Sequence, residues 1–141
     1  MKESDPYDLQ RFVEAQASVI DEVREELRDG RKRSHWMWFV FPQIAGLGHS
    51  PMAQKYAISG RAEAAAYLQH PVLGPRLREC TRLVNEVQGR DIEEILGSID
   101  AMKFRSSMTL FAQVAEDKRD FQDALAKYFG GKLDEMTLAR L

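Results

Sequence analysis

The sequence has a single cysteine, no long apolar run and no excess of charge of either sign. One cysteine, Cys80, excludes an internal disulfide framework and a zinc site built from several thiolates. The longest apolar stretch, Trp36 to Pro42, falls far short of the roughly 20 residues that a membrane helix needs. The N-terminal residues contain no apolar signal-peptide core. We therefore expect a cytoplasmic protein that does not enter a membrane.

The charge balance argues against a general nucleic-acid binder. The chain carries 20 basic and 22 acidic residues, which gives a formal net charge of −2. Proteins that bind nucleic acid usually carry a basic excess, so nucleic acid is not an expected partner. The 44% hydrophobic content predicts a packed globule rather than disorder. A length of 141 residues fits one domain, which we expect to span 1–141.

Apolar residues recur at helical spacing along most of the chain. The clearest pattern has steps of four and three residues: Leu73, Leu77, Cys80, Val84 and Val87. A second apolar face follows the same spacing: Phe104, Met108, Phe111 and Ala115. Each pattern places its members on one side of a helix. The sequence predicts an all-α fold, a single compact domain of about seven or eight helices.

Cap residues mark several helix ends. Asp5-Pro6 predicts the start of a helix over residues 6–29, either continuous or broken near Ala17-Ser18, and Gly30 predicts its end. Ser50-Pro51 predicts another start by the same logic.

Three apolar side chains are expected to face inward from short helices. Met52 would do so in the helix after Pro51. Met136 and Leu138 would dock a C-terminal helical segment that begins near Asp134.

The segment near residues 33–50 is irregular and rich in aromatics. Between His35 and His49 the pattern fits neither strand alternation nor helical spacing, so a strand and a short buried helix both stay open. Pro42, Gly46 and Gly48 predict irregular backbone after it.

The basic run Arg31–Arg33 precedes Trp36 and Trp38. It could hold an anionic group while a tryptophan stacks on a planar one. The competing interpretation is a helix C-terminus complemented by bases, followed by core aromatics. RNA binding through this run is the least favoured reading of it.

A second candidate site lies on the helix expected around residues 100–115. Lys103, Ser106 and Ser107 share one side of that helix. Small polar residues of this kind can simply allow close helix packing, or they can bind an anion. A Ser–Lys nucleophile pair is the third alternative, and it requires Lys103 to be buried enough to lose its proton.

The histidines give no metal-ligand spacing. His35, His49 and His70 are far apart in sequence, so neither a metal site nor a cofactor is predicted. His35 is the best placed of them for proton transfer, but the favoured interpretation is a satisfied core or interface histidine. Cys80 lies on an inward helix face, where a thiol is inert.

Several motifs together resemble a known family. They are Asp5-Pro-Tyr-Asp-Leu-Gln-Arg-Phe-Val-Glu-Ala-Gln16, Ser34-His-Trp-Met-Trp-Phe-Val-Phe-Pro-Gln-Ile-Ala-Gly-Leu-Gly48, Tyr56-Ala-Ile, His70-Pro-Val-Leu-Gly-Pro-Arg-Leu and Lys103-Phe-Arg-Ser-Ser-Met-Thr-Leu-Phe111. The chain resembles the bacterial domain-of-unknown-function family 1810, often mislabelled calpastatin. The resemblance implies a small all-helical cytoplasmic protein and no established activity. Calpain-inhibitor repeats are disordered, which this composition is not.

The leading functional hypothesis is a small-molecule binding protein, with hydrolysis of its ligand as an open extension. A small anionic, nucleotide-like ligand matches the available chemistry. The candidate ligand-binding residues are Arg33, His35, Trp38, Gln43, Lys103, Arg105, Ser106, Ser107 and Thr109. The alternative is a protein–protein interaction module that exposes the aromatic surface from Trp36 to Phe41. The catalytic residues, the oligomeric state and whether the protein is an enzyme are not determined by the sequence.

Overall fold

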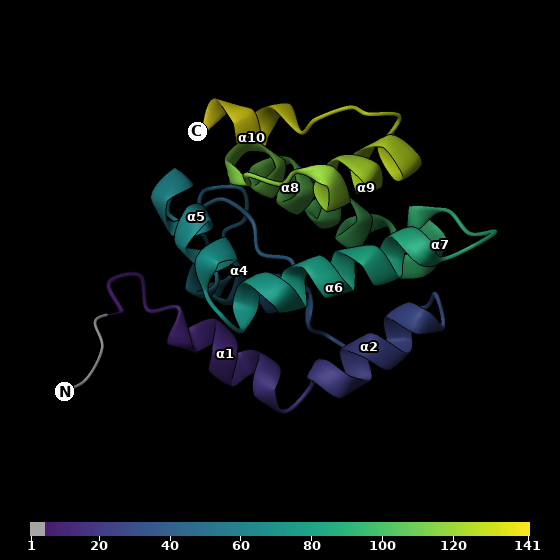
Figure 1. The fold of residues 1–141 in the computed structure, drawn as a ribbon, viewed down its shortest axis with the longest axis horizontal. Coiled ribbons are helices and arrows are strands. Elements are labelled where there is room, and N and C mark those ends of the chain that lie inside the picture. The colour runs from purple at the N-terminus through teal and green to yellow at the C-terminus, as the bar shows by residue number, and fades with distance from the viewer. Residues whose placement is uncertain (1–4) are drawn as a thin grey trace.

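The computed structural model describes residues 5–141 and shows ten α-helices within that range (Figure 1). Their bounds are α1 Gln10–Ala17, α2 Ile20–Arg28, α3 Met37–Val40, α4 Pro51–Lys55, α5 Arg61–Gln69, α6 Leu73–Glu86, α7 Ile92–Leu96, α8 Ser98–Val114, α9 Arg119–Phe129 and α10 Glu135–Ala139. The described residues add one isolated parallel β-bridge, between Ile44 and Ile58. The all-α prediction is confirmed. The helices outnumber the expected seven or eight because α3, α4, α7 and α10 have only four or five residues each.

Helices α6 and α8 form the centre of the fold. α6 packs against α2, α5 and α9, while α8 packs against α5, α7, α9 and α10 (Figure 1). The apolar face predicted for α6 is confirmed by its buried members, Leu73, Leu77, Cys80 and Val84. Burial raises the pKa of the Cys80 thiol to about 12, so this thiol stays protonated and unreactive. No helix of residues 5–141 is both long enough and apolar enough to cross a bilayer.

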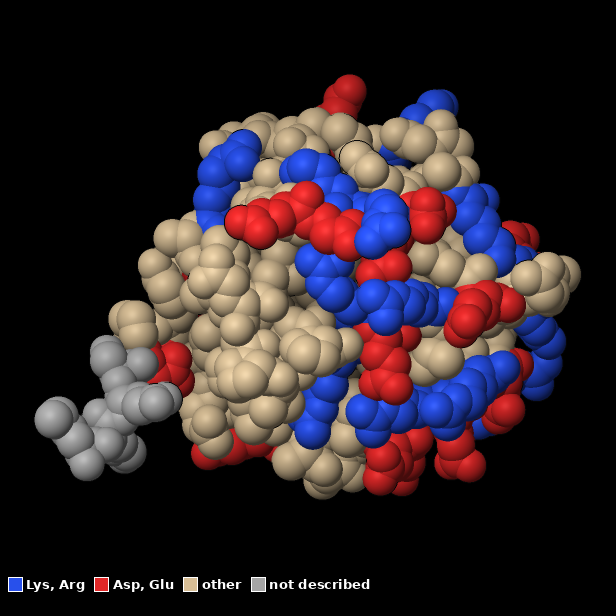
Figure 2. Space-filling model, in the orientation of Figure 1, with Lys and Arg blue, Asp and Glu red and all other residues tan. Residues whose placement is uncertain are grey.

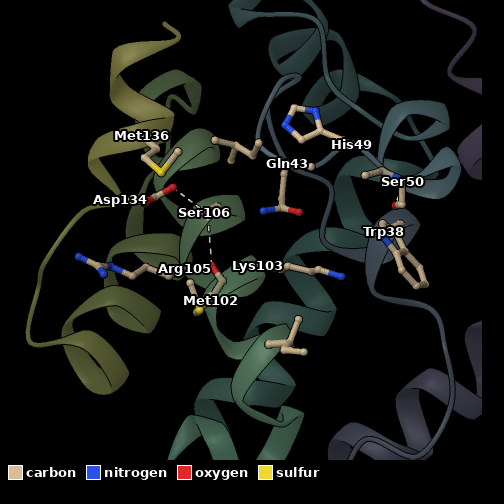
Figure 3. Close-up of a pocket in the computed structure, with 14 residues that line it drawn as sticks. Trp38, Gln43, His49, Ser50, Met102, Lys103, Arg105, Ser106, Asp134 and Met136 are labelled. Carbon is tan, nitrogen blue, oxygen red and sulfur yellow. Dashed lines mark hydrogen bonds between the residues drawn. The ribbon is translucent and has the colours of Figure 1, made fainter.

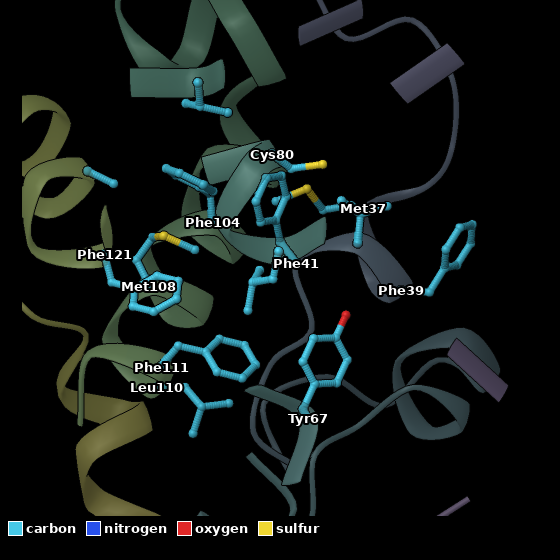
Figure 4. Packing of buried hydrophobic residues seen from close by; sticks show 14 of the residues in the cluster. Met37, Phe39, Phe41, Tyr67, Cys80, Phe104, Met108, Leu110, Phe111 and Phe121 are labelled. Atoms are coloured by element: carbon cyan, nitrogen blue, oxygen red, sulfur yellow. The ribbon is translucent and has the colours of Figure 1, made fainter. Parts of the chain in front are cut away.

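The aromatic segment after residue 33 turns into the core rather than onto the surface (Figure 4). Trp36, Phe39 and Phe41 are 1%, 7% and 0% exposed. Phe41 meets Phe104 of α8 edge to face, with ring centroids 4.9 Å apart, which is a favourable aromatic arrangement. Of the two alternatives for this segment, the short buried helix is right, as α3. The hypothesis of an exposed aromatic surface is wrong, because three of its side chains fill the core.

The N-terminal helix is broken, as one of the two alternatives allowed, but it does not begin at Pro6. A turn comes first, in which Asp8 has a φ of 51°, and α1 begins at Gln10. Asp5 still serves the helix start, since its carboxylate accepts hydrogen bonds from the amides of Leu9 and Gln10 at 2.8 and 3.0 Å. The prediction that Asp5 accepts from amides at the helix start is therefore confirmed, but the N-cap position is Leu9, not Asp5, because the helix starts later than predicted.

A buried carboxylate holds the chain where α2 ends. Gly30, at φ 69°, lets the chain leave the helix, and the next residues fold back over Glu26, which is 5% exposed. Glu26 accepts four hydrogen bonds at 2.5 to 3.1 Å, from the amides of Arg33 and Ser34, the Ser34 hydroxyl and the Trp36 indole. Burial alone would raise the pKa of this carboxyl group, but the four donors outweigh burial and lower its pKa.

A second buried ionic group ties α1 to α5. The Arg11 guanidinium donates to the carbonyls of Lys55 and Ala57, each at 2.8 Å, and pairs with Glu63 at 2.9 Å. Glu63, only 3% exposed, also accepts hydrogen bonds from the amide and hydroxyl of Ser59. The pair therefore fixes the turn between α4 and α5, and nothing in the spacing of the sequence indicates it.

The short helices α4 and α10 partly depart from expectation. Ser50 caps α4 as predicted, because its hydroxyl accepts from the Ala53 amide at 3.1 Å. Met52 and Met136, expected inward, are instead 37% and 62% exposed. Thr137 is the residue that docks α10, at 0% exposed. A helix of about one turn turns only one narrow side to the core, so most of its residues remain outside it.

Surface charges on the face shown in Figure 2 interleave rather than gather by sign. Arg78 and Arg82 of α6 share Asp120 of α9, at 3.7 and 3.1 Å. Arg24 of α2 binds Glu79 of α6 at 2.9 Å. These pairs link the helices across the surface, and exposed pairs of this kind typically add little to stability.

Helices α5 and α6 approach each other closely at a glycine. A Cβ atom built on Gly74 would lie 2.1 Å from the carbonyl oxygen of Leu68. Real Cβ atoms do not approach an oxygen so closely, and that oxygen belongs to the backbone, which cannot swing away. The turn between the two helices therefore depends on the missing side chain.

The Glu26 network predicts an acid-sensitive stability. Glu26→Gln should lower the free energy of unfolding by about 1 kcal/mol near pH 7. The glutamine keeps an oxygen for the N–H donors, and the Ser34 hydroxyl can rotate to accept a hydrogen bond from the new NH₂ group. Glu26→Ala leaves three N–H groups buried without partners and should cost about 3 kcal/mol. Since the native pKa lies below the ordinary value of 4.5, the carboxylate stabilises the fold above pH 4.5 and loses that effect as pH falls through the native pKa.

Urea unfolding of the three proteins from about pH 3 to about pH 8 measures both effects. The glutamine variant should lack the part of the acid-dependent loss that Glu26 contributes. Equal stability of all three proteins near pH 7 would contradict the network's role.

Gly74→Ala should lower the free energy of unfolding by about 2 kcal/mol or more, because α5 and α6 must separate to admit the methyl group. Gly60→Ala is the matched control. Gly60 has an extended φ of 171° and open space around its Cβ position, so the change should cost less than about 1 kcal/mol. Urea denaturation measures both variants, and an equal effect would show that the close approach is not required.

Candidate functional site

A cavity of about 380 Å³ opens between the loop that follows α3, the first half of α8 and the start of α10 (Figure 3). Its polar and aromatic lining comprises Trp38, Gln43, His49, Ser50, Lys103, Arg105, Ser106 and Asp134. The rest of the wall is apolar or glycine: Leu47, Gly48, Ala53, Ile99, Met102 and Met136. Pockets for small molecules typically measure roughly 300–1,000 Å³ and are mostly apolar with a few placed polar groups. The size and the lining both fit that description.

Backbone contacts hold the loop that forms one wall. The Ala45 amide donates to the Ile58 carbonyl and the Ile58 amide donates to the Gln43 carbonyl, each at 2.8 Å. Gly46 has a φ of 96°, and the Arg140 guanidinium lies where its Cβ would be. The irregular backbone predicted from this glycine is confirmed. Because the Gln43 backbone is held in the bridge, its side-chain amide projects into the cavity (Figure 3).

Lys103 is the ammonium group of the cavity wall. Its Nζ lies 4.5 Å from the ring centroid of Trp38 and 3.7 Å from Oδ1 of Asp100. The other oxygen of Asp100 binds Lys32 at 2.9 Å, so that carboxylate is shared between two lysines. The Lys103 side chain is 24% exposed. It is therefore both reachable from the cavity and only loosely paired.

Arg105 lines the cavity, but its charge is engaged elsewhere. Its guanidinium donates to the backbone carbonyls of Lys132 and Leu133 at 3.0 and 2.8 Å. These carbonyls belong to the loop between α9 and α10, whose backbone acceptors need partners. Arg105 therefore anchors the C-terminal segment on α8, and the predicted role as an anion holder lacks geometric support.

The hydroxyl groups of α8 also anchor the C-terminal segment. The Ser106 hydroxyl donates to Oδ2 of Asp134 at 2.7 Å, and the Thr137 hydroxyl donates to the same oxygen at 2.5 Å. The Asp134 amide donates to the Thr109 hydroxyl at 2.9 Å. Asp134 thereby joins α8 to α10 and forms part of the cavity wall at their junction.

The basic run after α2 is turned away from the cavity. Arg33 is exposed and pairs with Asp29 at 2.7 Å, and Lys32 pairs with Asp100. His35 is exposed and does not line the cavity. The competing interpretation of this run, bases complementing a helix end, describes Arg33 well.

The structure brings together five of the nine candidate residues at the cavity: Trp38, Gln43, Lys103, Arg105 and Ser106. The other four lie outside it: Arg33, His35, Ser107 and Thr109. Ser107 is 0% exposed within the core, and its hydroxyl has no hydrogen-bond partner among the described residues. Neighbours in sequence diverge here because successive residues of a helix point about 100° apart.

Nine of the fourteen lining residues are not among the candidates, and four of these nine bear on the chemistry of the cavity. His49 follows a glycine-rich turn, which gave a weak signal of its own. The sequence gives no signal for Asp134, Met102 and Met136, since only the docking of α10 onto α8 brings Asp134 and Met136 to Met102. Within residues 5–141, no three side chains of His, Cys, Asp or Glu converge as metal ligands. The lining instead includes one ammonium, from Lys103, one side-chain amide, from Gln43, and one carboxylate, from Asp134.

Comparisons with known proteins agree with the motifs. A family model described as a protein of unknown function (DUF1810) matches residues 6–141. The conserved hypothetical protein Rv1873 from Mycobacterium tuberculosis, whose crystal structure is solved, is 63% identical. Its structure matches with a TM-score of 0.96, over 97% of this chain and 98% of that one. No curated protein matches the chain. The family predicted from the motifs is thus confirmed, and the chain belongs to the DUF1810 family of proteins of unknown function.

Proposed function

We propose that this protein binds a small, partly flat organic molecule whose single anionic group is held by Lys103. The observation that carries the proposal is the loose pairing of Lys103 on the wall of the cavity. Its partner Asp100 is 3.7 Å from Nζ and is shared with Lys32. An ammonium group has three N–H donors, so a ligand carboxylate or phosphate oxygen would form a closer and stronger contact than Asp100 does.

The charges of the wall favour a ligand with one anionic group over a polyphosphate. The Arg105 guanidinium is occupied by two carbonyls. Asp134 adds a carboxylate to the same lining and would repel further negative charge. The predicted nucleotide-like ligand is therefore narrowed to a carboxylate or a monophosphate.

The remaining lining suits a flat, partly apolar body. The Trp38 indole lies beside Lys103, and Gln43 and His49 offer hydrogen bonds within the cavity (Figure 3). Met102 and Met136 present thioethers, which contact aromatic rings favourably and adapt to their shape.

The proposal is one of binding without a chemical step. Hydrolysis needs an activated nucleophile or a positioned acid and base. The Ser106 hydroxyl donates to Asp134, which anchors α10, and its other hydrogen-bond partner is the backbone carbonyl of Met102, at 3.2 Å on the same helix. The Ser–Lys pair considered from the sequence therefore has no supporting contact here.

Exposed apolar side chains at the cavity also fit a ligand. Ile99, Met102 and Met136 are 71%, 72% and 62% exposed, and all three line the cavity. A bound molecule would cover part of this surface. The alternative of an interaction module is less well supported, because it requires the segment from Trp36 to Phe41 to be exposed, and most of its aromatic side chains are buried.

A cytoplasmic location is part of the proposal. The single thiol, Cys80, is free and 1% exposed. An unpaired thiol suits a reducing compartment. Small carboxylates and monophosphates are expected there as well, so protein and ligand would meet.

Ligand binding predicts a specific loss in Lys103→Met. A thermal-shift screen with benzoate, indole-3-acetate, AMP, ADP and ADP-ribose should reveal at least one ligand, since a concentration of 100 times Kd stabilises a protein by about 2.7 kcal/mol. Calorimetry should then show about 10- to 100-fold weaker binding of that ligand to Lys103→Met, because a hydrogen-bonded charge is removed. A ligand with one anionic group, such as benzoate, indole-3-acetate or AMP, should bind more tightly than ADP.

Arg61→Met is the matched control. Arg61 is exposed at the start of α5, outside the cavity, and the substitution removes one positive charge as Lys103→Met does. Binding to this variant should equal that of the wild type. Unchanged affinity in Lys103→Met, or no stabilisation by any compound at millimolar concentration, would refute the proposal.

A further inference from the structure

We infer that the ligand also carries a hydrogen-bond donor, and that Asp134 recognises it at the opposite end of the cavity from the Lys103 ammonium. The inference rests on the proposed function, because it describes the second half of the same ligand. It names the ligand class more narrowly: an amphoteric molecule, with an anionic group at one end and an amino group at the other.

One of the two oxygens of the Asp134 carboxylate accepts both of its hydroxyl hydrogen bonds. Both hydroxyl donors, Ser106 and Thr137, reach the same oxygen, Oδ2. Within the described chain no group donates to Oδ1, although Asp134 is part of the cavity wall. An ionised carboxylate only accepts hydrogen bonds, so Oδ1 requires a donor. Water or a ligand amino group can supply it.

The arrangement of the wall sets the spacing between the two ends. Ser106, which holds Asp134, lies three residues after Lys103 on the same side of α8, a rise of about 5 Å. In Figure 3 the Lys103 side chain points toward Trp38 and away from Asp134, with the Gln43 amide between the two. Because the Lys103 side chain points away from Asp134, the two ends lie farther apart than this rise, so a ligand that reaches both needs a body of at least one ring between its two polar groups (Figure 3).

The apolar part of the cavity wall suits an uncharged ring. Met102 lies on α8 and Met136 on α10, so their side chains border the cavity from its two helical walls. Both side chains are largely exposed, at 72% and 62%. A ring between the two charged ends would cover apolar surface that otherwise faces water.

A purely structural role for Asp134 would require only one of its two carboxylate oxygens. Anchoring α10 needs a single acceptor oxygen for the two hydroxyls, and an asparagine oxygen supplies that. Asp134→Asn would keep this oxygen toward Ser106 and Thr137 and place its amide NH₂ where Oδ1 was. The substitution therefore preserves the anchor and changes the cavity wall from an acceptor to a donor.

The test compares four benzoates by calorimetry: 4-aminobenzoate and 4-(aminomethyl)benzoate, which carry a donor, against benzoate and 4-cyanobenzoate, which do not. In the wild type at least one amino compound should bind 10-fold or more tightly than benzoate. Asp134→Asn should abolish that preference and favour 4-cyanobenzoate, whose nitrile accepts a hydrogen bond. Thr137→Val is the control for weakened anchoring. Thr137 is buried outside the cavity, so this variant should keep the amino preference.

The outcomes separate this inference from the proposed function. If benzoate binds in a Lys103-dependent way and the amino compounds bind no more tightly, the inference is wrong and the proposed function stands. An amino preference that survives in Asp134→Asn also overturns the inference. If none of the four benzoates binds at millimolar concentration, the inference fails, and Lys103-dependent binding of AMP or indole-3-acetate would then sustain the proposed function alone.

Discussion

The buried carboxylate of Glu26 is the contact on which one wall of the cavity depends. Its four hydrogen bonds fix the chain from Arg33 to Trp36. Because α3 begins directly after Trp36, the same contact sets the position of Trp38 and of the loop that carries Gln43. A charge is costly to bury, and the cost is offset here because all four donors come from one short segment. The carboxylate and the segment therefore order each other.

The opposite wall comes from the C-terminal segment, which polar contacts hold in place. Arg105 satisfies two carbonyls of the loop before α10, and Thr109 and Ser106 bind the backbone and side chain of Asp134. The Met136 side chain remains largely exposed and adds little apolar packing. Elsewhere on the surface the charged groups neutralise one another across helices (Figure 2). At the cavity, by contrast, Lys103 is only loosely paired, with its Nζ 3.7 Å from Asp100, and both hydroxyl donors to Asp134 use the same carboxylate oxygen.

Helix content and most helix limits follow from local chemistry. The apolar spacing of residues 73–87 specifies α6, and Ser50 caps α4 by a hydrogen bond to a residue three positions along the chain. Such signals act within about one helical turn, so sequence displays them directly. The predicted start of α1 and the predicted burial of Met52 and Met136 are wrong, because both depend on how each short segment packs against the rest of the molecule.

The residues of the candidate site also divide into those that local sequence signals predict and those that tertiary packing places. Sequence alone determined that the chain is all-helical, that the backbone near Gly46 is irregular, and that Lys103 and Ser106 share one helix side. Only the tertiary structure decided that Arg33 and Ser107 leave the site and that Asp134 enters it. The physical reason is the range of the interactions. Helix periodicity joins residues three or four apart, whereas the bond between Ser106 and Asp134 spans 28 residues and exists only once α10 lies on α8.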